Sequence, residues 1–137
     1  MILFGCAALA ALICVGAYPR PRASAYASPS TAAAQLETRC GWFSNPTPAN
    51  IWLYDRDGEW TIGVQGGYQV EQDWDWPGFK KGQWVETNGH YGYGCACIRM
   101  RVEKESGHVL EIGSARARPL SACRKDRALN KWKKMLE

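Results

Sequence analysis

A short stretch of alternating acidic and aromatic residues is the part of this sequence best suited to chemistry. Glu71, Asp73 and Asp75 alternate there with Trp74 and Trp76. The carboxylates could serve glycoside hydrolysis or calcium binding, but both need a fixed geometry that one loop does not supply. Indole rings stack on ligands, and carboxylates accept hydrogen bonds. We therefore predict a ligand-binding surface at Asp73, Trp74, Asp75 and Trp76. A solvated loop, or one that packs its own aromatic rings as a plug, is the alternative.

Four cysteines form a second group with chemical potential: Cys40, Cys95, Cys97 and Cys123. In a small exported domain, such a set is typical of two disulfides. Cys95 and Cys97 share one face of an expected strand, where a bond between them would be strained. Each is therefore expected to bond a different terminal arm. The strand before Cys123 should pair with this one, which favours Cys95–Cys123 and Cys40–Cys97.

Metal binding and catalysis are the alternatives for these cysteines. With His90 or His108 they could ligate zinc, but no C-x2-C pair is present and export favours oxidation. A redox pair would need a C-x-x-C motif opening a helix. The chain also lacks a G-x-S-x-G elbow and a glycine-rich phosphate loop before a helix. We predict no catalytic residue, no metal and no cofactor.

The N-terminal part has the composition of an export signal. Residues 2–17 form an apolar run that is shorter than the roughly 20 residues of a membrane span and typical of a signal peptide. Small residues suited to cleavage follow between positions 17 and 27, so residues 1–25 are predicted to be the signal, with an uncleaved anchor or a lipidated cysteine as alternatives. Residues 26–37 form a low-complexity linker. We expect a periplasmic or secreted protein with no membrane span after processing.

The remaining residues, 38–137, are expected to form one β domain with a basic C-terminal tail. Strand-like alternation bounded by turns occurs at 49–54, 59–64, 83–87, 90–102 and 108–116. The strongest turn signal is Asn88-Gly89, which would place Val85 opposite Gly92. An irregular loop, 65–82, lies between the strands, and a short helix is expected from Ser121 to Leu129. The predicted fold is all-β: a small antiparallel barrel or curved sheet of five or six strands, with disulfides and a C-terminal helix.

Charge is distributed unevenly within this domain. Residues 28–98 carry four basic and eight acidic groups, net −4, whereas residues 99–137 carry eleven basic and five acidic groups, net +6. A basic region of this kind could meet nucleic acid, anionic lipid or an acidic glycan. We interpret it as a solvated tail and predict no nucleic-acid partner. The oligomeric state does not follow from the sequence.

Several motifs resemble one family of small bacterial envelope proteins of unknown function, DUF4087. The resemblance rests on the segments 39–42, 45–50, 55–60, 65–68, 87–97 and 119–126. It implies a bacterial, periplasmic protein but no activity, so no catalytic residue can be transferred. Together with the residues above, it favours a non-enzymatic binding module for an envelope glycan or protein, including an inhibitor. The alternative is a periplasmic hydrolase that uses Glu71, Asp73 or Asp75.

Overall fold

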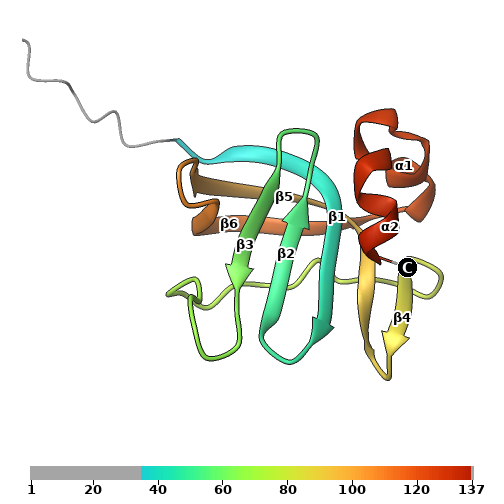
Figure 1. Cartoon of the computed structure of the whole chain (residues 1–137), viewed down its shortest axis with the longest axis horizontal. Helices are drawn as coiled ribbons and strands as arrows, with labels where there is room; N and C mark the ends of the chain where they lie inside the picture. The colour runs from blue at the N-terminus through green and yellow to red at the C-terminus, as the bar shows by residue number, and fades with distance from the viewer. Residues whose placement is uncertain (1–34, 137) are drawn as a thin grey trace, which may run out of the picture. The chain divides into compact units, whose positions relative to one another are not determined.

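Six strands followed by three short helical segments make up residues 35–136, the part of the chain that the computed structural model describes (Figure 1). The strands are β1 (Glu37–Thr47), β2 (Asn50–Tyr54), β3 (Glu59–Gly63), β4 (Trp84–Asn88), β5 (Tyr91–Glu103) and β6 (His108–Arg118). The helical segments are α1 (Leu120–Lys125), the 3-10 helix η1 (Arg127–Trp132) and α2 (Lys133–Leu136). The predicted β-dominated fold with a C-terminal helix is confirmed. The predicted signal peptide, 1–25, and most of the predicted linker, 26–37, lie outside the described residues.

The strands form one sheet that is partly ring-like. Its order is β1-β2-β3-β6-β5-β4, and β1 also pairs with β5. All pairings are antiparallel except that of β3 with β6, which meet in parallel at a single residue pair, Thr61 and His108. The hairpin expected at Asn88-Gly89 joins β4 to β5. Its register shifts at the turn, so Val85 lies opposite Tyr93 rather than the expected Gly92.

Strand β1 was not predicted from the sequence, although it pairs along both of its edges. It is hydrogen-bonded to β2 along one edge and to β5 along the other. The pairing with β5 runs from Glu37, opposite Met100, to Asn45, opposite Gly92. Residues 41–45 are all buried, so the alternation that marks a half-exposed strand is absent. Gly41 is required for close packing, because a Cβ there would collide with the backbone carbonyl of Tyr54.

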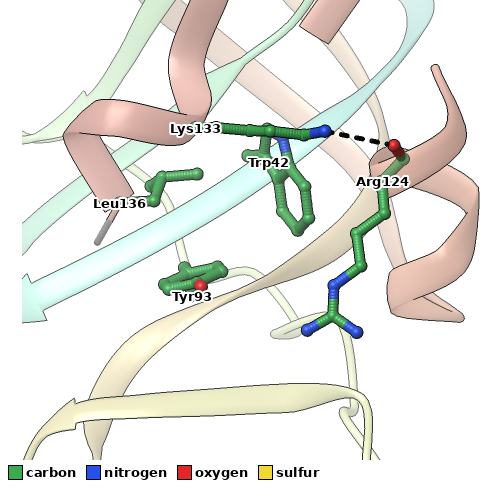
Figure 2. Close-up of a pocket in the computed structure, with 5 residues that line it drawn as sticks. All are labelled: Trp42, Tyr93, Arg124, Lys133 and Leu136. Carbon is green, nitrogen blue, oxygen red and sulfur yellow. Dashed lines mark hydrogen bonds between the residues drawn. The ribbon is translucent and has the colours of Figure 1, made fainter. Parts of the chain in front are cut away.

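Successive residues of β1 enter two separate hydrophobic clusters. Phe43 is fully buried in the main core, which consists of Phe43, Ile51, Leu53, Trp60, Ile62, Ala96, Ile98, Met100, Val102, Val109 and Ile112. Trp42 points to the other face and packs between the sheet and the helical segments, with Tyr54, Cys95, Cys123, Leu129 and Leu136. Figure 2 shows Trp42 beside Tyr93 and Leu136 in this second cluster. The C-terminal segments therefore cover the face of the sheet opposite the main core.

The two disulfides have the pairing that the sequence favoured. Cys40–Cys97 joins directly facing residues of β1 and β5, with Cα atoms 4.0 Å apart. Cys95–Cys123 joins β5 to α1, with Cα atoms 5.7 Å apart. The cysteines of β5 lie on the face opposite Ala96 and Ile98, as the alternation predicted. The bonds indicate an oxidising, non-cytoplasmic location. Among residues 35–136, no helix has the length and apolar character needed to cross a membrane.

The short helix predicted from Ser121 to Leu129 is present, but its predicted extent is wrong. Helix α1 begins after Pro119 and ends at Lys125. Asp126 is extended, and its carboxylate accepts a hydrogen bond from the backbone N–H of Ala128, which starts η1. An aspartate at this position favours capping the first turn of η1 over continuing helix α1.

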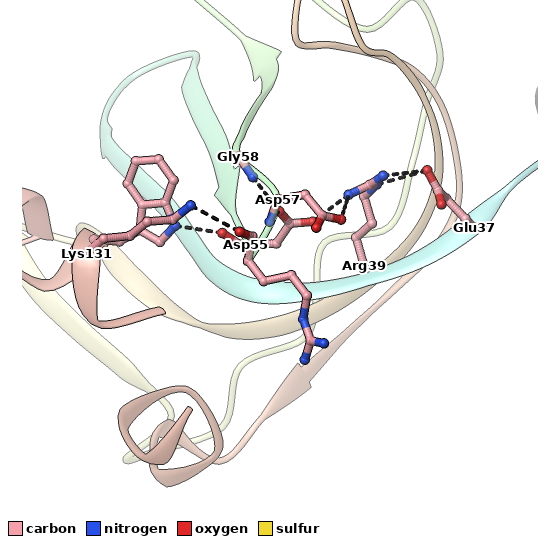
Figure 3. A network of polar contacts seen from close by, with 8 residues as sticks. Glu37, Arg39, Asp55, Asp57, Gly58 and Lys131 are labelled. Atoms are coloured by element: carbon pink, nitrogen blue, oxygen red, sulfur yellow. Dashed lines mark hydrogen bonds and ion pairs between the residues drawn. The ribbon is translucent and has the colours of Figure 1, made fainter. Parts of the chain in front are cut away.

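A charge cluster is centred on the buried pair of Arg39 and Asp55, with Glu37 and Asp57 at its exposed side (Figure 3). The Arg39 guanidinium donates to Asp55 at 2.8 Å, to Asp57 at 3.0 Å and to Glu37 at 2.6 Å. It also lies 4.2 Å from the centre of the Trp60 ring. Burial lowers the pKa of the Arg39 guanidinium, but hydrogen bonds and charge from the three carboxylates more than offset this and raise the pKa.

Asp55 extends this cluster to the C-terminal segments. Its carboxylate accepts from the backbone N–H groups of Asp57 and Gly58, which closes the β2–β3 turn. Its carbonyl accepts from the Trp132 indole at 2.7 Å, and Lys131 donates to the neighbouring carbonyl of Arg56. The cluster thus connects β1, the β2–β3 turn and η1.

The close approach of β1 to β2 can be tested at Gly41. Gly41→Ala is expected to lower the free energy of unfolding by about 1–3 kcal/mol, because the new methyl group must push β1 away from Tyr54. Gly58→Ala is the matched control, since an added Cβ there meets nothing within 4 Å. It should change stability by less than about 0.5 kcal/mol. Urea denaturation of the oxidised protein measures both, and equal values for the two variants would contradict the steric argument.

The ion pairs of Arg39 are expected to contribute more to the free energy of unfolding than an exposed ion pair does. Arg39→Met should cost about 3–5 kcal/mol of unfolding free energy, because Asp55 would remain buried without its cation. Arg101→Met removes the more exposed pair with Glu111 and should cost about 1 kcal/mol or less. The same denaturation assay compares them. A loss at Arg39 no larger than the loss at Arg101 would show that the cluster does not hold these segments together.

Candidate ligand-binding surface

The segment between β3 and β4 lies along the part of the β6 edge that β3 does not pair. The Gln72 side chain donates to the Ile112 carbonyl at 2.8 Å and accepts from the Ile112 N–H at 2.9 Å, as a neighbouring strand would. Further along, the Ala117 N–H donates to the Pro77 carbonyl at 2.7 Å. These bonds satisfy backbone N–H and C=O groups of β6 that have no partner in β3, because β3 and β6 pair at one position only. The loop is therefore held against a rigid strand.

Five aromatic residues, which we call the aromatic cluster, gather where this loop crosses the main core. They are Phe43, Trp74, Trp76, Phe79 and Trp84. Phe43 is at the centre, with ring centroids 6.3 Å from Trp74, 5.2 Å from Trp76, 5.8 Å from Phe79 and 6.3 Å from Trp84. Contacts with Trp74 and Trp76 are edge-to-face, a favourable geometry for aromatic rings. One fully buried ring from β1 therefore supports the loop tryptophans.

The two tryptophans of the loop differ in exposure. Trp74 is half-buried and packs against the main core. Trp76 is 47% exposed and stacks on Trp74, with centroids 5.6 Å apart and planes 10° from parallel. Trp74 thus acts in part as the aromatic plug that was the alternative prediction for this loop. Trp76 presents an aromatic surface to solvent, and its position is fixed by Trp74, which packs against the core.

A groove of about 330 Å³ runs beside this pair. One wall consists of Gln72, Asp73, Trp74 and Asp75, and the other is the β6 segment 112–115. Asp73 and Asp75 are exposed, and neither makes an ion pair or a side-chain hydrogen bond within residues 35–136. Their oxygens are therefore open to hydrogen-bond donors of a ligand.

Three of the four residues predicted from the sequence, Asp73, Trp74 and Asp75, line the groove. The fourth, Trp76, stacks on Trp74 but does not line the groove. Glu71 is exposed but does not line the groove. Phe43 was not predicted to belong to the site, because β1 was not predicted as a strand. The opposite wall was not predicted either, since nothing in the sequence indicates that residues about 40 positions later meet the loop.

The remaining candidates for chemistry have structural partners. The ring of His108 stacks on Tyr68 with centroids 3.9 Å apart, and His90 packs on Tyr91 at 4.2 Å. The four cysteines predicted to pair are in disulfides. Within the described part of the chain, no group of three or more His, Cys, Asp or Glu side chains is placed to hold a metal ion.

Comparison with known proteins identifies a family without an assigned activity. The model of DUF4087, described as a protein of unknown function, matches residues 34–130. No curated protein and no solved structure matches the chain. The matched region includes the loop tryptophans, the groove and all four disulfide cysteines.

The difference between the two loop tryptophans can be tested by stability. Trp74→Ala is expected to lower the free energy of unfolding by about 2–4 kcal/mol, because it empties space against the core. Trp76→Ala should cost about 1 kcal/mol or less, since nearly half of that side chain is exposed. Each kcal/mol should move the melting temperature of a domain of this size by about 4–8 °C. A loss at Trp76 as large as that at Trp74 would make Trp76 a core residue.

Proposed function

The chain belongs to the DUF4087 family, whose function is unknown, and from its own surface we propose that it is a non-enzymatic binding domain for a glycan chain. The observation that carries this proposal is the exposed Trp76, stacked on Trp74 beside a groove with two open carboxylates. The apolar C–H face of a pyranose ring packs on such an indole ring. Its hydroxyl groups donate hydrogen bonds to carboxylate oxygens.

The rigidity of this surface supports binding. Trp76 contacts the fully buried Phe43, and the loop is bonded to β6 through Gln72 and Pro77. A preorganised aromatic ring loses little conformational entropy when a ligand arrives. The combination of one exposed indole with Asp73 and Asp75 favours a hydroxyl-rich ligand over a protein, because charged residues are depleted from the centres of protein interfaces.

The placement of the carboxylates favours binding over hydrolysis. A glycoside hydrolase uses two carboxyl groups that flank the scissile bond, about 5–9.5 Å apart. Asp73 and Asp75 both come from one wall of the groove, with Trp74 between them in the sequence. The facing wall, Ile112 to Ala115, has no ionisable side chain. A hydrolase that uses Glu71, Asp73 or Asp75 is therefore the weaker candidate.

The proposed setting is the bacterial envelope or the medium outside it. Two disulfides support an oxidising compartment, and the apolar run at residues 2–17 supports export. Envelope and extracellular polysaccharides are abundant there, so a periplasmic or secreted protein would meet ligands of the proposed class.

Glycan binding can be tested with the oxidised protein on an array of bacterial polysaccharides and oligosaccharides. Trp76→Ala is expected to weaken retention on the preferred glycan about tenfold, because the stacking surface is lost. Asp73→Asn and Asp75→Asn should weaken it several-fold. Met135→Ala, which removes another exposed apolar side chain that does not line the groove, should bind as the unchanged protein does.

Two outcomes would contradict the proposal. If no glycan is retained, or if Met135→Ala reduces retention as much as Trp76→Ala, the surface is not a glycan site. If the preferred glycan gains new reducing ends during incubation, and Asp73→Asn or Asp75→Asn stops this, the hydrolase alternative is correct.

A further inference from the structure

The two disulfides differ in how far solvent can reach them. Cys95 and Cys123 are each 2% exposed, so neither end of that bond meets solvent. Cys97 is also buried, but its partner Cys40 is exposed. Cys40 also lines a cavity of about 320 Å³ that none of the other three cysteines lines. Of these four cysteines, Cys40 is therefore the one open to attack by a reagent from solvent.

The buried end of the Cys40–Cys97 bond lies among arginines. The Arg118 guanidinium donates to the sulfur of Cys97 at 3.5 Å. Arg116 is directly opposite Cys97 on β6, and Arg99 and Arg116 line a cavity of about 200 Å³ with Cys97. None of these three arginines forms an ion pair within residues 35–136. Nearby positive charge stabilises a thiolate, so this environment favours negative charge on the sulfur of Cys97.

Thiol–disulfide exchange requires both of these features. An attacking thiolate must reach one sulfur of the bond, and the other sulfur must leave with the electron pair of the broken bond. Exposure selects Cys40 as the sulfur that is attacked, and the arginines select Cys97 as the sulfur that leaves. The Cys95–Cys123 bond offers no exposed sulfur, so an external thiolate cannot reach it in the folded protein.

We propose that Cys40–Cys97 is an exchangeable disulfide, opened by a dithiol that attacks Cys40, and that Cys95–Cys123 is a structural bond. One thiolate of the dithiol bonds to the sulfur of Cys40, the bond to Cys97 breaks, and its electron pair stays on Cys97 beside Arg118. The second thiolate of the dithiol then attacks the mixed disulfide and releases Cys40. The dithiol is oxidised to a disulfide, the two cysteines are reduced, and the two protons of the dithiol pass to solvent or to the released sulfurs.

The charge around Cys40 restricts the class of dithiol. The 320 Å³ cavity contains four carboxylates and two guanidinium groups, which gives a net charge of −2: Glu37, Asp55, Asp57, Asp126, Arg39 and Arg56. A negative cavity lowers the local concentration of an anionic reductant such as glutathione. An uncharged or cationic dithiol therefore suits this approach to Cys40.

Dithiothreitol, an uncharged dithiol, is a suitable probe of the oxidised protein. The reaction is quenched with acid at early times, free thiols are alkylated, and the labelled peptides are measured by mass spectrometry. Cys40 and Cys97 should be labelled at least about tenfold faster than Cys95 and Cys123 in native buffer. In concentrated urea the two bonds should open at similar rates, because the difference comes from the fold. Equal rates in native buffer, or faster opening of Cys95–Cys123, would overturn the proposal.

The direction of attack can be tested with 2-mercaptoethanol, an uncharged monothiol. It should form a mixed disulfide on Cys40 and leave Cys97 as a free thiol that can be alkylated, because Cys97 is buried. A mixed disulfide found mainly on Cys97 would contradict the assigned roles of the two sulfurs.

Arg118 provides a test of the leaving sulfur. Arg118→Gln should slow the opening of Cys40–Cys97 about tenfold, since the departing thiolate loses a charged donor, and Arg118→Lys should keep most of the rate. Arg127→Gln removes an exposed arginine that does not line either cavity containing Cys97, and it should react as the unchanged protein does. A less stable fold would open both bonds faster, so slowing of one bond reports on the thiolate. If Arg118→Gln reacts as fast as Arg127→Gln, the assigned role of Arg118 is wrong.

Discussion

The close approach of backbones on both sides of β1 is the constraint on which the rest of this structure depends. β1 is hydrogen-bonded to β2 along one edge and to β5 along the other, and the contact with β2 leaves no space for a side chain at position 41. Pairing along both edges closes part of the sheet into a ring, and the ordinary alternation of the strand turns Trp42 and Phe43 to opposite faces. Phe43 then supports the loop tryptophans, and Trp42 packs against the C-terminal helical segments. The candidate surface and the packing on the opposite face therefore depend on a single strand.

Charge and covalent bonds stabilise this strand in different ways. Arg39 is buried with Asp55, and a buried ion pair tolerates few alternative arrangements because each would leave an ion without a partner. The cluster therefore specifies how β1 meets the β2–β3 turn. The disulfides act mainly by restricting the unfolded chain, and they join β1 and α1 to neighbouring positions of β5. Tyr54 is buried. Its desolvation, together with the charge of Glu59, raises the pKa of its hydroxyl.

Local patterns predicted much of the fold, and long-range pairing explains what they missed. Alternation and turn residues identified β2 to β6, because each of these strands has an exposed face or a strong turn at its end. The same alternation placed Cys95 and Cys97 on one face and so favoured the observed bonds. β1 escaped detection because residues 41–45 are buried on both faces. For the candidate site, composition identified Asp73 to Trp76. The groove was not predictable, since its second wall comes from Ile112 to Ala115 and meets the loop only through tertiary hydrogen bonds.

The position of the Cys40–Cys97 bond has a mechanical consequence. Cys40 is close to the start of β1, ahead of Gly41, Trp42 and Phe43, and its partner lies directly opposite on β5. Tension applied through the chain that precedes β1 first loads the pairs from Glu37 to Arg39, and at Cys40 it meets the covalent crosslink and passes into β5. The hydrogen bonds of the strand beyond Cys40 carry little of that load, so peeling from the N-terminal end stops at Cys40. Pulling on this end would therefore leave Trp42 and Phe43 in place while the disulfide remains intact.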